Sequence, residues 1–558
     1  MRALAVLFCA ALACSGAALP GRYFRLMEAG IAQVDASALK VESRPKSHYF
    51  PGALMVASVL YAKAHQDNPR AGDPTMLALA LKLGDLLAAE SESGIYQKRA
   101  DHHRDTYMWL EAYRLLEPKL GEQRRARWGR ELLKLIDDLA VQAAERQDRP
   151  AYTSPFGVSV NHTALFSSTV YLAGRVFGKR EWEQLGGRIM HRYAAEEQSP
   201  DGYWGEHSRN GPTTAYDYLT VAGVALYWEH SHDPAALAAL RRSTDFHEHF
   251  TYPDGNSAMI TDDRRRHAYV SPWAHFGFSH FDDGRRYAEF LTGFSEPGGG
   301  FEHLGRLAQD ALYYHEGPLA PIPHDADHYL YRMAVPAGIR KTGPWVVCLS
   351  GLMGTQAVTS RYYLDRQSSF EVFHQKYGLI ISGANSKRQP ELATLRERIA
   401  GQWYHMPLDT RLHMSEQGDR LSLAYNTLVA ELQVDPPSET RLPFRFTARR
   451  KGDQEEAYVT LQLCLKPGEA LETGAGRKVM PGEERIALAA KDLGGSIRHR
   501  GWTLAWDGAA QLDWPVYPYN PYAEGPEKSL EYAVGALSFP LDLASGRELA
   551  IGFKLEAR

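Results

Sequence analysis

Cysteine is scarce in this chain of 558 residues, which contains four. Cys9 and Cys14 lie in the N-terminal apolar segment, whereas Cys348 and Cys464 lie in runs typical of β-strands. No CxxC motif or mixed Cys/His spacing is present, so the sequence does not indicate a zinc site of the common structural types. We predict that Cys348 and Cys464 are small buried residues rather than a disulfide, and we expect no metal or other cofactor.

Long apolar runs and blocks of one charge are also lacking. Beyond the N-terminus no segment holds about 18 uninterrupted apolar residues, so we expect no membrane span. The 63 basic and 67 acidic side chains are dispersed and give a net charge of −4. This excludes the basic tail or block that is typical of nucleic-acid binding. The composition instead indicates a globular protein with room for two or three domains.

The N-terminal segment, MRALAVLFCAALACSGAALP, has the pattern of a secretory signal peptide. Arg2 precedes an apolar run, and the small residues 15–17 offer a cleavage site. We therefore predict a signal peptide over residues 1–20 and a secreted or periplasmic protein. The ALAC sequence also resembles a lipid-attachment site at Cys14, but Ala11 stands where Leu is usual, so we favour simple cleavage.

The spacing of apolar residues differs between two regions in the rest of the chain. From about residue 50 to 315 the apolar residues recur with helical spacing, as in TMLALALKLGDLLAAE, in segments that alternate with polar breaks. Beyond the Pro-rich stretch at 318–328 short β-rich runs follow, separated by Gly, Pro, Asp and Asn. We therefore predict an α+β protein with a helical domain over 21–317 and an antiparallel β-sandwich over 318–558. Residues 384–415 lack a clear period and are predicted to form a long loop.

Asn161 and His162 stand at the start of one predicted helix, in SVNHTALFSS. Side chains at a helix start lie beside free backbone N–H groups, so a polar ligand can be held there. The pair is therefore a candidate site. The ordinary alternative is an Asn N-cap with an incidental His.

The stretch DGYWGEHSRNGPTTAYDY (201–218) has far more polar and aromatic groups than a linker needs. Its candidate functional residues enter the next long helix and are Glu206, Arg209, Tyr216 and Tyr218. The alternative for this stretch is a capped turn whose tyrosines belong to the core. The charged turn at 250–267, with Arg264, is a further candidate and is equally consistent with a solvated loop.

Aromatic side chains near these segments could serve as sugar platforms. Sugar C–H faces pack on aromatic rings while neighbouring polar groups bond the hydroxyls. We select Trp109, Trp204 and Trp273 for this role, although each is equally consistent with a core position.

Together these segments resemble the helical-toroid polysaccharide lyases, the group of heparinase II/III and alginate or oligoalginate lyases. The Asn-His pair, DGYWGEHSR with its following Tyr, and YPDG…DDR carry the resemblance, over roughly residues 160–266. It implies an incomplete (α/α) toroid followed by the β-sandwich. It also implies a lyase that acts on an acidic, uronate-containing polysaccharide.

In that group the uronate loses its C5 proton, and the bond from C4 to its oxygen then breaks. Donors must hold the neighbouring carboxylate and stabilise the enolate-like state. Carried over by position, Asn161 would hold the carboxylate and His162 would assist or act as base. Tyr216 would be the acid/base, while Glu206 and Arg209 would order the loop and bind sugar.

Tyr216 and Tyr218 both fit the spacing of this resemblance. Tyr216 comes nearer the helix start, where a side chain can reach a cavity, and Tyr218 would point about 200° away on an ideal helix. We therefore assign the acid/base to Tyr216 and a substrate contact to Tyr218.

One departure concerns the β domain, where these lyases usually present a His-x-Asp before an SF…G strand. Here Tyr362 and Tyr363 stand where His is expected. This puts a zinc site in doubt and leaves a catalytic partner to be found. We rank His405 first as its substitute, because its segment lacks strand periodicity, and His374 second.

Two other functions remain open from the residues. A toroid glycoside hydrolase would need two carboxylates roughly 5–10 Å apart, and the available ones are Glu206, Asp217, Asp254 and Asp262. A glycan-binding protein without catalysis would explain the missing β-domain His.

Overall fold

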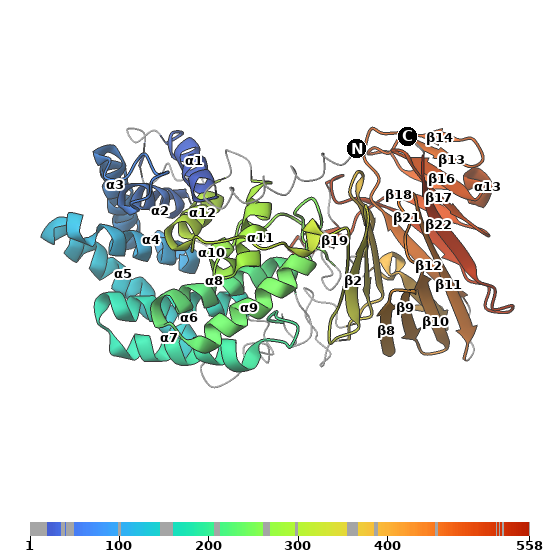
Figure 1. Ribbon diagram of the computed structural model, residues 1–558, viewed down its shortest axis with the longest axis horizontal. Coiled ribbons are helices and arrows are strands. Elements are labelled where there is room, and N and C mark those ends of the chain that lie inside the picture. Colours follow the sequence, from blue (N-terminus) through green and yellow to red (C-terminus); the bar gives the residue numbers. More distant parts are fainter. Residues whose placement is uncertain are drawn as a thin grey trace, which may run out of the picture. The chain divides into compact units, whose positions relative to one another are not determined.

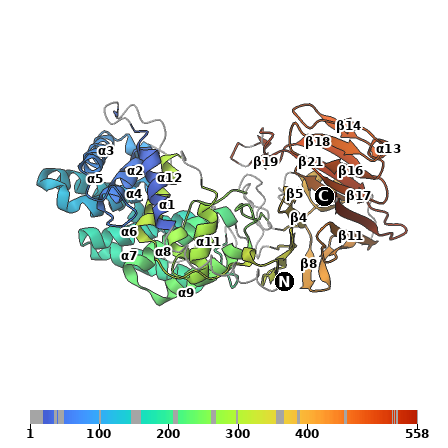
Figure 2. The ribbon, with the colours of Figure 1, turned by 45° about the horizontal axis from the view of Figure 1, so that its top comes forward.

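The structure is a computed structural model, and it describes residues 19–34, 39–40, 49–98, 102–145, 160–205, 213–259, 268–295, 300–353, 366–383, 389–451, 456–520, 522–523, 525–526 and 529–556. The chain forms two compact units, one mainly of helices and one mainly of strands (Figures 1 and 2). The first comprises Met1–Gln198, Tyr216–Asp245 and Val270–Ile322. The second comprises Ser199–Ala215, Phe246–Tyr269 and Pro323–Arg558. Two segments that precede the expected boundary at 317/318 therefore group with the strands.

The helices form an incomplete (α/α) toroid, as the resemblance implied. Those described before the strands are α1 (Leu19–Ile31), α2 (Tyr49–Ala62), α3 (Pro74–Glu92), α4 (His102–Leu116), α5 (Gly121–Ala144), α6 (Val160–Phe177), α7 (Arg180–Arg192), α8 (Thr214–Ser231), α9 (Pro234–His249), α10 (His275–Phe278), α11 (Asp282–Thr292) and α12 (Phe301–Tyr313). Local chemistry sets their ends: Asp73 caps α3 by accepting the N–H of Thr75 at 2.8 Å, and Pro74 follows at the first helical position.

Helices α6 and α7 show how neighbouring helices pack in this unit, and they lie side by side in Figure 1. A Cβ on Gly174 would stand 2.4 Å from the backbone nitrogen of Glu183. One on Gly186 would stand 2.5 Å from the carbonyl oxygen of Ser167. Only glycine fits at these two positions, because the helices touch backbone to backbone.

The second unit is built on two large antiparallel sheets. In the first sheet the strand order is β1 (His328–Arg332), β2 (Ala337–Thr342), β3 (Trp345–Ser350), β4 (Ser369–His374), β5 (Gly378–Ser382), β12 (Glu456–Leu463), β21 (Val534–Pro540), β18 (Gln511–Val516) and β15 (Ile486–Leu488), with β6 (Leu395–Ile399) on β12 and β7 (Gln402–Tyr404) on β6. In the second the order is β14 (Lys478–Val479), β13 (Leu471–Thr473), β16 (Ser496–His499), β17 (Trp502–Trp506), β22 (Leu549–Leu555), β11 (Arg441–Arg450), β10 (Leu428–Val434), β9 (Gly418–Ala424) and β8 (Asp409–Ser415). The pair β19 (Tyr519–Asn520) and β20 (Gly525–Pro526) and the short helix α13 (Ala490–Leu493) complete the described elements of this unit.

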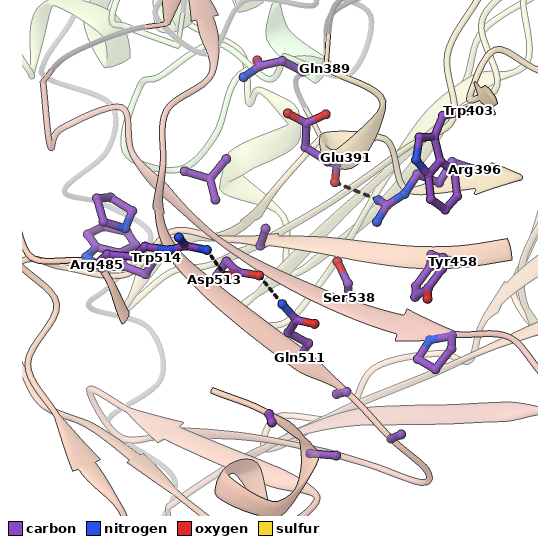
Figure 3. A pocket seen from close by; sticks show the side chains of 18 of the residues that line it. Gln389, Glu391, Arg396, Trp403, Tyr458, Arg485, Gln511, Asp513, Trp514 and Ser538 are labelled. Atoms are coloured by element: carbon purple, nitrogen blue, oxygen red, sulfur yellow. Dashed lines mark hydrogen bonds and ion pairs between the residues drawn. The ribbon is translucent and has the colours of Figure 1, made fainter. Parts of the chain in front are cut away.

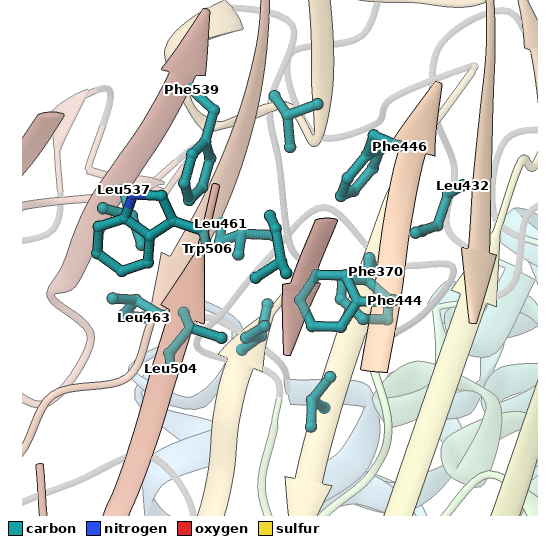
Figure 4. Close-up of a cluster of buried hydrophobic side chains, with 14 of the residues drawn as sticks. Phe370, Leu432, Phe444, Phe446, Leu461, Leu463, Leu504, Trp506, Leu537 and Phe539 are labelled. Atoms are coloured by element: carbon teal, nitrogen blue, oxygen red, sulfur yellow. The ribbon is translucent and has the colours of Figure 1, made fainter. Parts of the chain in front are cut away.

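The core of this unit lies between the two sheets and makes them a sandwich, as predicted (Figure 4). Strand β10 shows the cause, since alternate residues from Leu428 to Val434 are buried and the residues between them are exposed or partly exposed. Phe370 of the first sheet meets Phe444 of the second with ring centroids 4.8 Å apart. Burial of large side chains at such positions contributes roughly 1.5–3 kcal/mol each.

Residues 246–258 cover the other face of β3 and β4. The ring of Tyr252 stacks on that of Phe373 at 4.8 Å, and its hydroxyl donates to Glu371 at 2.5 Å. Burial and the nearby Cys348 and Glu371 raise the pKa of Tyr252 well above its usual value. The YPDG turn is thus anchored on the sandwich by a buried tyrosine.

The prediction of a long loop over residues 384–415 is wrong. This segment contains β6, β7 and β8. Strand β6 does not alternate in sequence because the consecutive residues Leu395, Arg396 and Glu397 are all buried. The guanidinium of Arg396 lies 5.1 Å from the ring of Trp403 in β7. Cys348 and Cys464 form no disulfide with each other, as predicted. The predicted burial is confirmed for Cys348, whereas Cys464 is only half-buried.

No described helix is both long and apolar enough to pass through a membrane.

Candidate functional site

The start of α6 presents an amide donor. Asn161 lies in the first turn and is 1% exposed, and its side-chain oxygen accepts the N–H of His162 at 2.8 Å. Among the described residues its Nδ2 donates no hydrogen bond. Tyr193 fixes the backbone beside it by donating to the carbonyl of Val160 at 3.1 Å. A positioned amide with an uncommitted donor suits a carboxylate ligand.

Helices α6 and α8 run parallel to each other. A Cβ on Gly223 of α8 would stand 3.1 Å from the Cβ of Ala164 in α6. Further along both helices Tyr171 packs edge-on against Tyr227, with ring centroids 5.0 Å apart. From the first contact to the second the residue numbers rise in both helices. The N-terminal ends of α6 and α8 therefore lie at the same end of the pair.

This register brings Asn161 and Tyr216 close together along the helix axes. Counting back from the two contacts at about 1.5 Å per residue, the two residues are offset by roughly 2–6 Å. Tyr216 lies seven residues before Gly223, which is about 20° from the same face of α8, so it faces α6. Its side chain is half-buried. The amide and the phenol therefore share one end of an adjacent helix pair.

His162 and Tyr218 take other directions. His162 is half-buried and lies about 100° around α6 from Asn161. Tyr218 is fully buried, and its hydroxyl lies 2.5 Å from that of Tyr287. It also packs edge-on against Phe278. Tyr218 therefore belongs to the helical core and exposes no surface for the substrate contact that was expected of it.

Several of the predicted sugar-binding residues cannot be placed. Glu206, Arg209 and Arg264 lie outside the described residues, as does Asp262 of the hydrolase alternative. Of the other two carboxylates, Asp217 is 2% exposed in α8. Asp254 belongs to the second unit and accepts the N–H of Asn256 in a turn.

The three selected tryptophans have no exposed ring face. Trp109 is fully buried, with its ring edge-on to that of Trp128. Trp204 is 2% exposed and Trp273 is 6% exposed, with the guanidinium of Arg306 over the Trp273 ring. A sugar platform needs an open ring, so these positions do not provide one.

The two candidate histidines of the β domain are both buried in the second unit. His405 is 7% exposed, and its backbone carbonyl accepts the hydroxyl of Tyr425. His374 accepts the N–H of Lys376 at its Nδ1, whereas its buried Nε2 has no partner among the described residues. Burial, with the nearby Lys376, lowers the pKa of His374 to about 4. His374 lines a cavity of about 1040 Å³.

A second cavity of the sandwich, which was not predicted from the sequence, is lined by the buried side chain of Arg396 (Figure 3). It measures about 830 Å³ and includes Arg396, Trp403, Tyr458 and Ser538 in its lining. The Nη1 of Arg396 donates to the carbonyl of Glu391 at 2.9 Å and to Thr460 at 2.7 Å. Its guanidinium lies 5.1 Å from the Trp403 ring and 5.2 Å from the Tyr458 ring.

Arg396 is only 9% exposed, and no described carboxylate lies within ion-pair distance of it, although Glu391 and Glu456 act on its charge from further away. A buried cation without a direct ion pair favours an anionic ligand. Away from both sites, Glu229, His280 and His315 of the first unit could together hold a metal ion.

Comparison with solved structures addresses the fold. A crystal structure of heparinase III matches 94% of this chain and 80% of its own, with a TM-score of 0.53 and 13% sequence identity. A heparinase III with methylated lysines matches 90% and 76%, with a TM-score of 0.50 and 10% identity. This chain has a heparinase III-like fold.

A Paenibacillus xanthan lyase matches 97% of this chain and 57% of its own, with a TM-score of 0.50 and 11% identity. Neither the search with protein-family models nor the search of curated proteins gave a match. The likeness therefore concerns the fold, and the polysaccharide lyase-like architecture extends over most of the chain.

Proposed function

We propose that the protein is a polysaccharide lyase that cleaves a uronate-containing acidic polysaccharide by β-elimination. The observation that carries the proposal is that Asn161, whose amide has an uncommitted donor, and Tyr216 lie at the same end of two parallel helices. The heparinase III-like fold supports it, because the structures it resembles are those of glycan-cleaving lyases.

In this mechanism Asn161 donates its Nδ2–H to the uronate carboxylate. The charged carboxylate keeps the C5 proton weakly acidic, and a fixed donor stabilises the enolate-like state that forms when the proton leaves. The C5–H electron pair then forms the C4=C5 double bond, and the C4–oxygen bond breaks. Tyr216 gives its proton to the leaving oxygen.

The proton at C5 needs a base, and His162 or a deprotonated Tyr216 would supply it. A tyrosine has an ordinary pKa of about 10, so it acts as base only where cations favour the phenolate. His162 is half-buried and follows Asn161 in the first turn of α6. We assign His162 as base or assistant and Tyr216 as acid.

A substrate panel tests the proposal. Untagged protein is incubated with alginate, glucuronan, ulvan and glycosaminoglycans, and the ultraviolet absorbance of the conjugated product is followed together with reducing ends. A lyase yields both signals from at least one polymer. New reducing ends without absorbance would indicate the hydrolase alternative instead.

A second candidate function is glycan binding by the sandwich, favoured by the cavity around Arg396. A carboxylate or sulfate of an acidic glycan would pair with this guanidinium, and Ser538 would bond hydroxyls. Retardation of the protein in native gels that contain each polymer measures this. Arg396→Gln should abolish the retardation, whereas Tyr216→Phe should keep it. Equal retardation of wild type and Arg396→Gln would reject the cavity as the site.

The location is also a proposal. We infer secretion or export to the periplasm from the signal-peptide pattern of residues 1–20, in which the small residues 15–17 offer a cleavage site. N-terminal sequencing of protein recovered outside the cytoplasm should then show that the apolar segment has been removed.

A further inference from the structure

Three metal-ligand side chains converge in the first unit. Glu229 lies near the end of α8, His280 lies between α10 and α11, and His315 follows α12. The Oε1 of Glu229 is 2.8 Å from the Nε2 of His315 and 3.2 Å from the Nε2 of His280. One ligand atom from each residue lies within 4.8 Å of the other two.

His280 provides an independent sign that a ligand belongs between them. Its side chain is 7% exposed, and its Nε2 lies 3.2 Å from the Oε1 of Glu229 but makes no hydrogen bond to any described residue. The same carboxylate oxygen bonds the Nε2 of His315 at 2.8 Å. A metal ion between the three ligand atoms would satisfy the buried Nε2 of His280.

The spacing of the ligand atoms suits a transition metal. Zinc binds imidazole nitrogen and carboxylate oxygen at about 2.0–2.2 Å, so neighbouring ligand atoms of a tetrahedron stand roughly 3.3 Å apart. The two distances from Glu229 come close to this value. His315 is 43% exposed, so one side of the cluster opens to solvent and leaves room for water as a fourth ligand.

We propose that Glu229, His280 and His315 form a binding site for one divalent transition-metal ion, with zinc as the ion that best fits these ligands. Bound metal would tie the end of α8 to the segments after α10 and α12. The site is independent of the lyase proposal, because neither Asn161 nor Tyr216 belongs to it.

Zinc titration of the untagged full-length chain tests the site. Protein stripped with EDTA and dialysed is titrated with zinc chloride by calorimetry, and its melting temperature is measured with and without zinc. We expect one zinc per chain and a higher melting temperature with zinc. His315→Ala and Glu229→Gln should each weaken binding by at least about tenfold.

His65→Ala is the matched control. His65 also pairs with a carboxylate of the first unit, Glu316, at 2.8 Å. It is not one of the three converging ligands, so the control variant should bind zinc as the wild type does. Because His315 is partly exposed, its variant should keep the wild-type circular dichroism spectrum. Absence of stoichiometric binding by the wild type, or equal affinity in His315→Ala and Glu229→Gln, would overturn the proposal.

Discussion

Tyr171 of α6 packs edge-on against Tyr227 of α8, with the ring planes at 78°. Together with the close approach of Gly223 to Ala164, this contact sets the direction and register of the two helices. The proposed site depends on that register. If the helices were antiparallel, Asn161 and Tyr216 would lie at opposite ends of the pair.

The first prediction concerns the proposed acid. Tyr216→Phe removes only the hydroxyl, so elimination should fall by about 10²–10⁴-fold while glycan binding changes little. The matched control is Tyr218→Phe, whose lost hydroxyl bonds Tyr287 in the core. The control should lower the melting temperature slightly and keep turnover. Wild-type turnover in Tyr216→Phe, together with loss in Tyr218→Phe, would reverse the assignment.

The second prediction concerns the carboxylate donor. Asn161→Asp keeps the shape of the side chain but places a negative charge where the uronate carboxylate should bind. We expect kcat to fall by about 10²–10³-fold, because the donor acts most strongly on the enolate-like state. Steady-state kinetics on the most active polymer measure this, and the melting temperature checks the fold. A normal kcat in a folded variant would remove Asn161 from the mechanism.

The third prediction tests the close contact of α6 with α8. A Cβ on Gly223 would stand 2.9 Å from the backbone carbonyl carbon of Ala164, which cannot move aside cheaply. Gly223→Ala should therefore lower the free energy of unfolding by about 1–3 kcal/mol. The higher helix propensity of alanine offsets part of this loss. Gly187→Ala in α7 is the matched control, because its Cβ would make only an ordinary contact of 3.4 Å with Tyr171. Thermal melting should show a lower midpoint for the first variant alone.

The fourth prediction concerns pH. The pKa of His374 is lowered to about 4 by burial and Lys376, against about 6.5 in an unfolded chain. Between these values the unfolded chain binds the proton and the folded chain does not, so stability falls as the pH falls. From pH 7 to pH 5 this loss amounts to about 2 kcal/mol.

His374→Gln should remove that part of the acid sensitivity in melting experiments. His328→Gln, at an exposed histidine of β1, is the control and should keep it. Identical pH profiles for the wild type and His374→Gln would contradict the assignment.

The sequence predicted the features that depend on local periodicity. Helix α5 and strand β10 could be recognised because the spacing of their apolar residues shows which face is buried. The assignment of the acid/base to Tyr216 rather than Tyr218 stays a prediction; Tyr216 is half-buried and Tyr218 is fully buried.

Features that depend on contacts between distant segments could not be predicted. A core tryptophan and a sugar platform look alike in sequence, and the burial of Trp204 and Trp273 comes from their neighbours in the fold. Strand β6, which lies between β12 and β7, was missed because Arg396 is buried near aromatic rings rather than exposed. Glu229, His280 and His315 come from three segments without a motif spacing.

Mass spectrometry of the products formed in oxygen-18 water tests the central claim most directly. Elimination adds no water, so each cleavage should give one fragment with an unsaturated uronate at its non-reducing end and no labelled oxygen in either fragment. Hydrolysis would put oxygen-18 into one fragment at every cleavage and leave both saturated. Unlabelled, unsaturated products from the wild type, and their loss in Tyr216→Phe, are the result that we predict. Labelled, saturated products would contradict the assignment of this protein as a lyase.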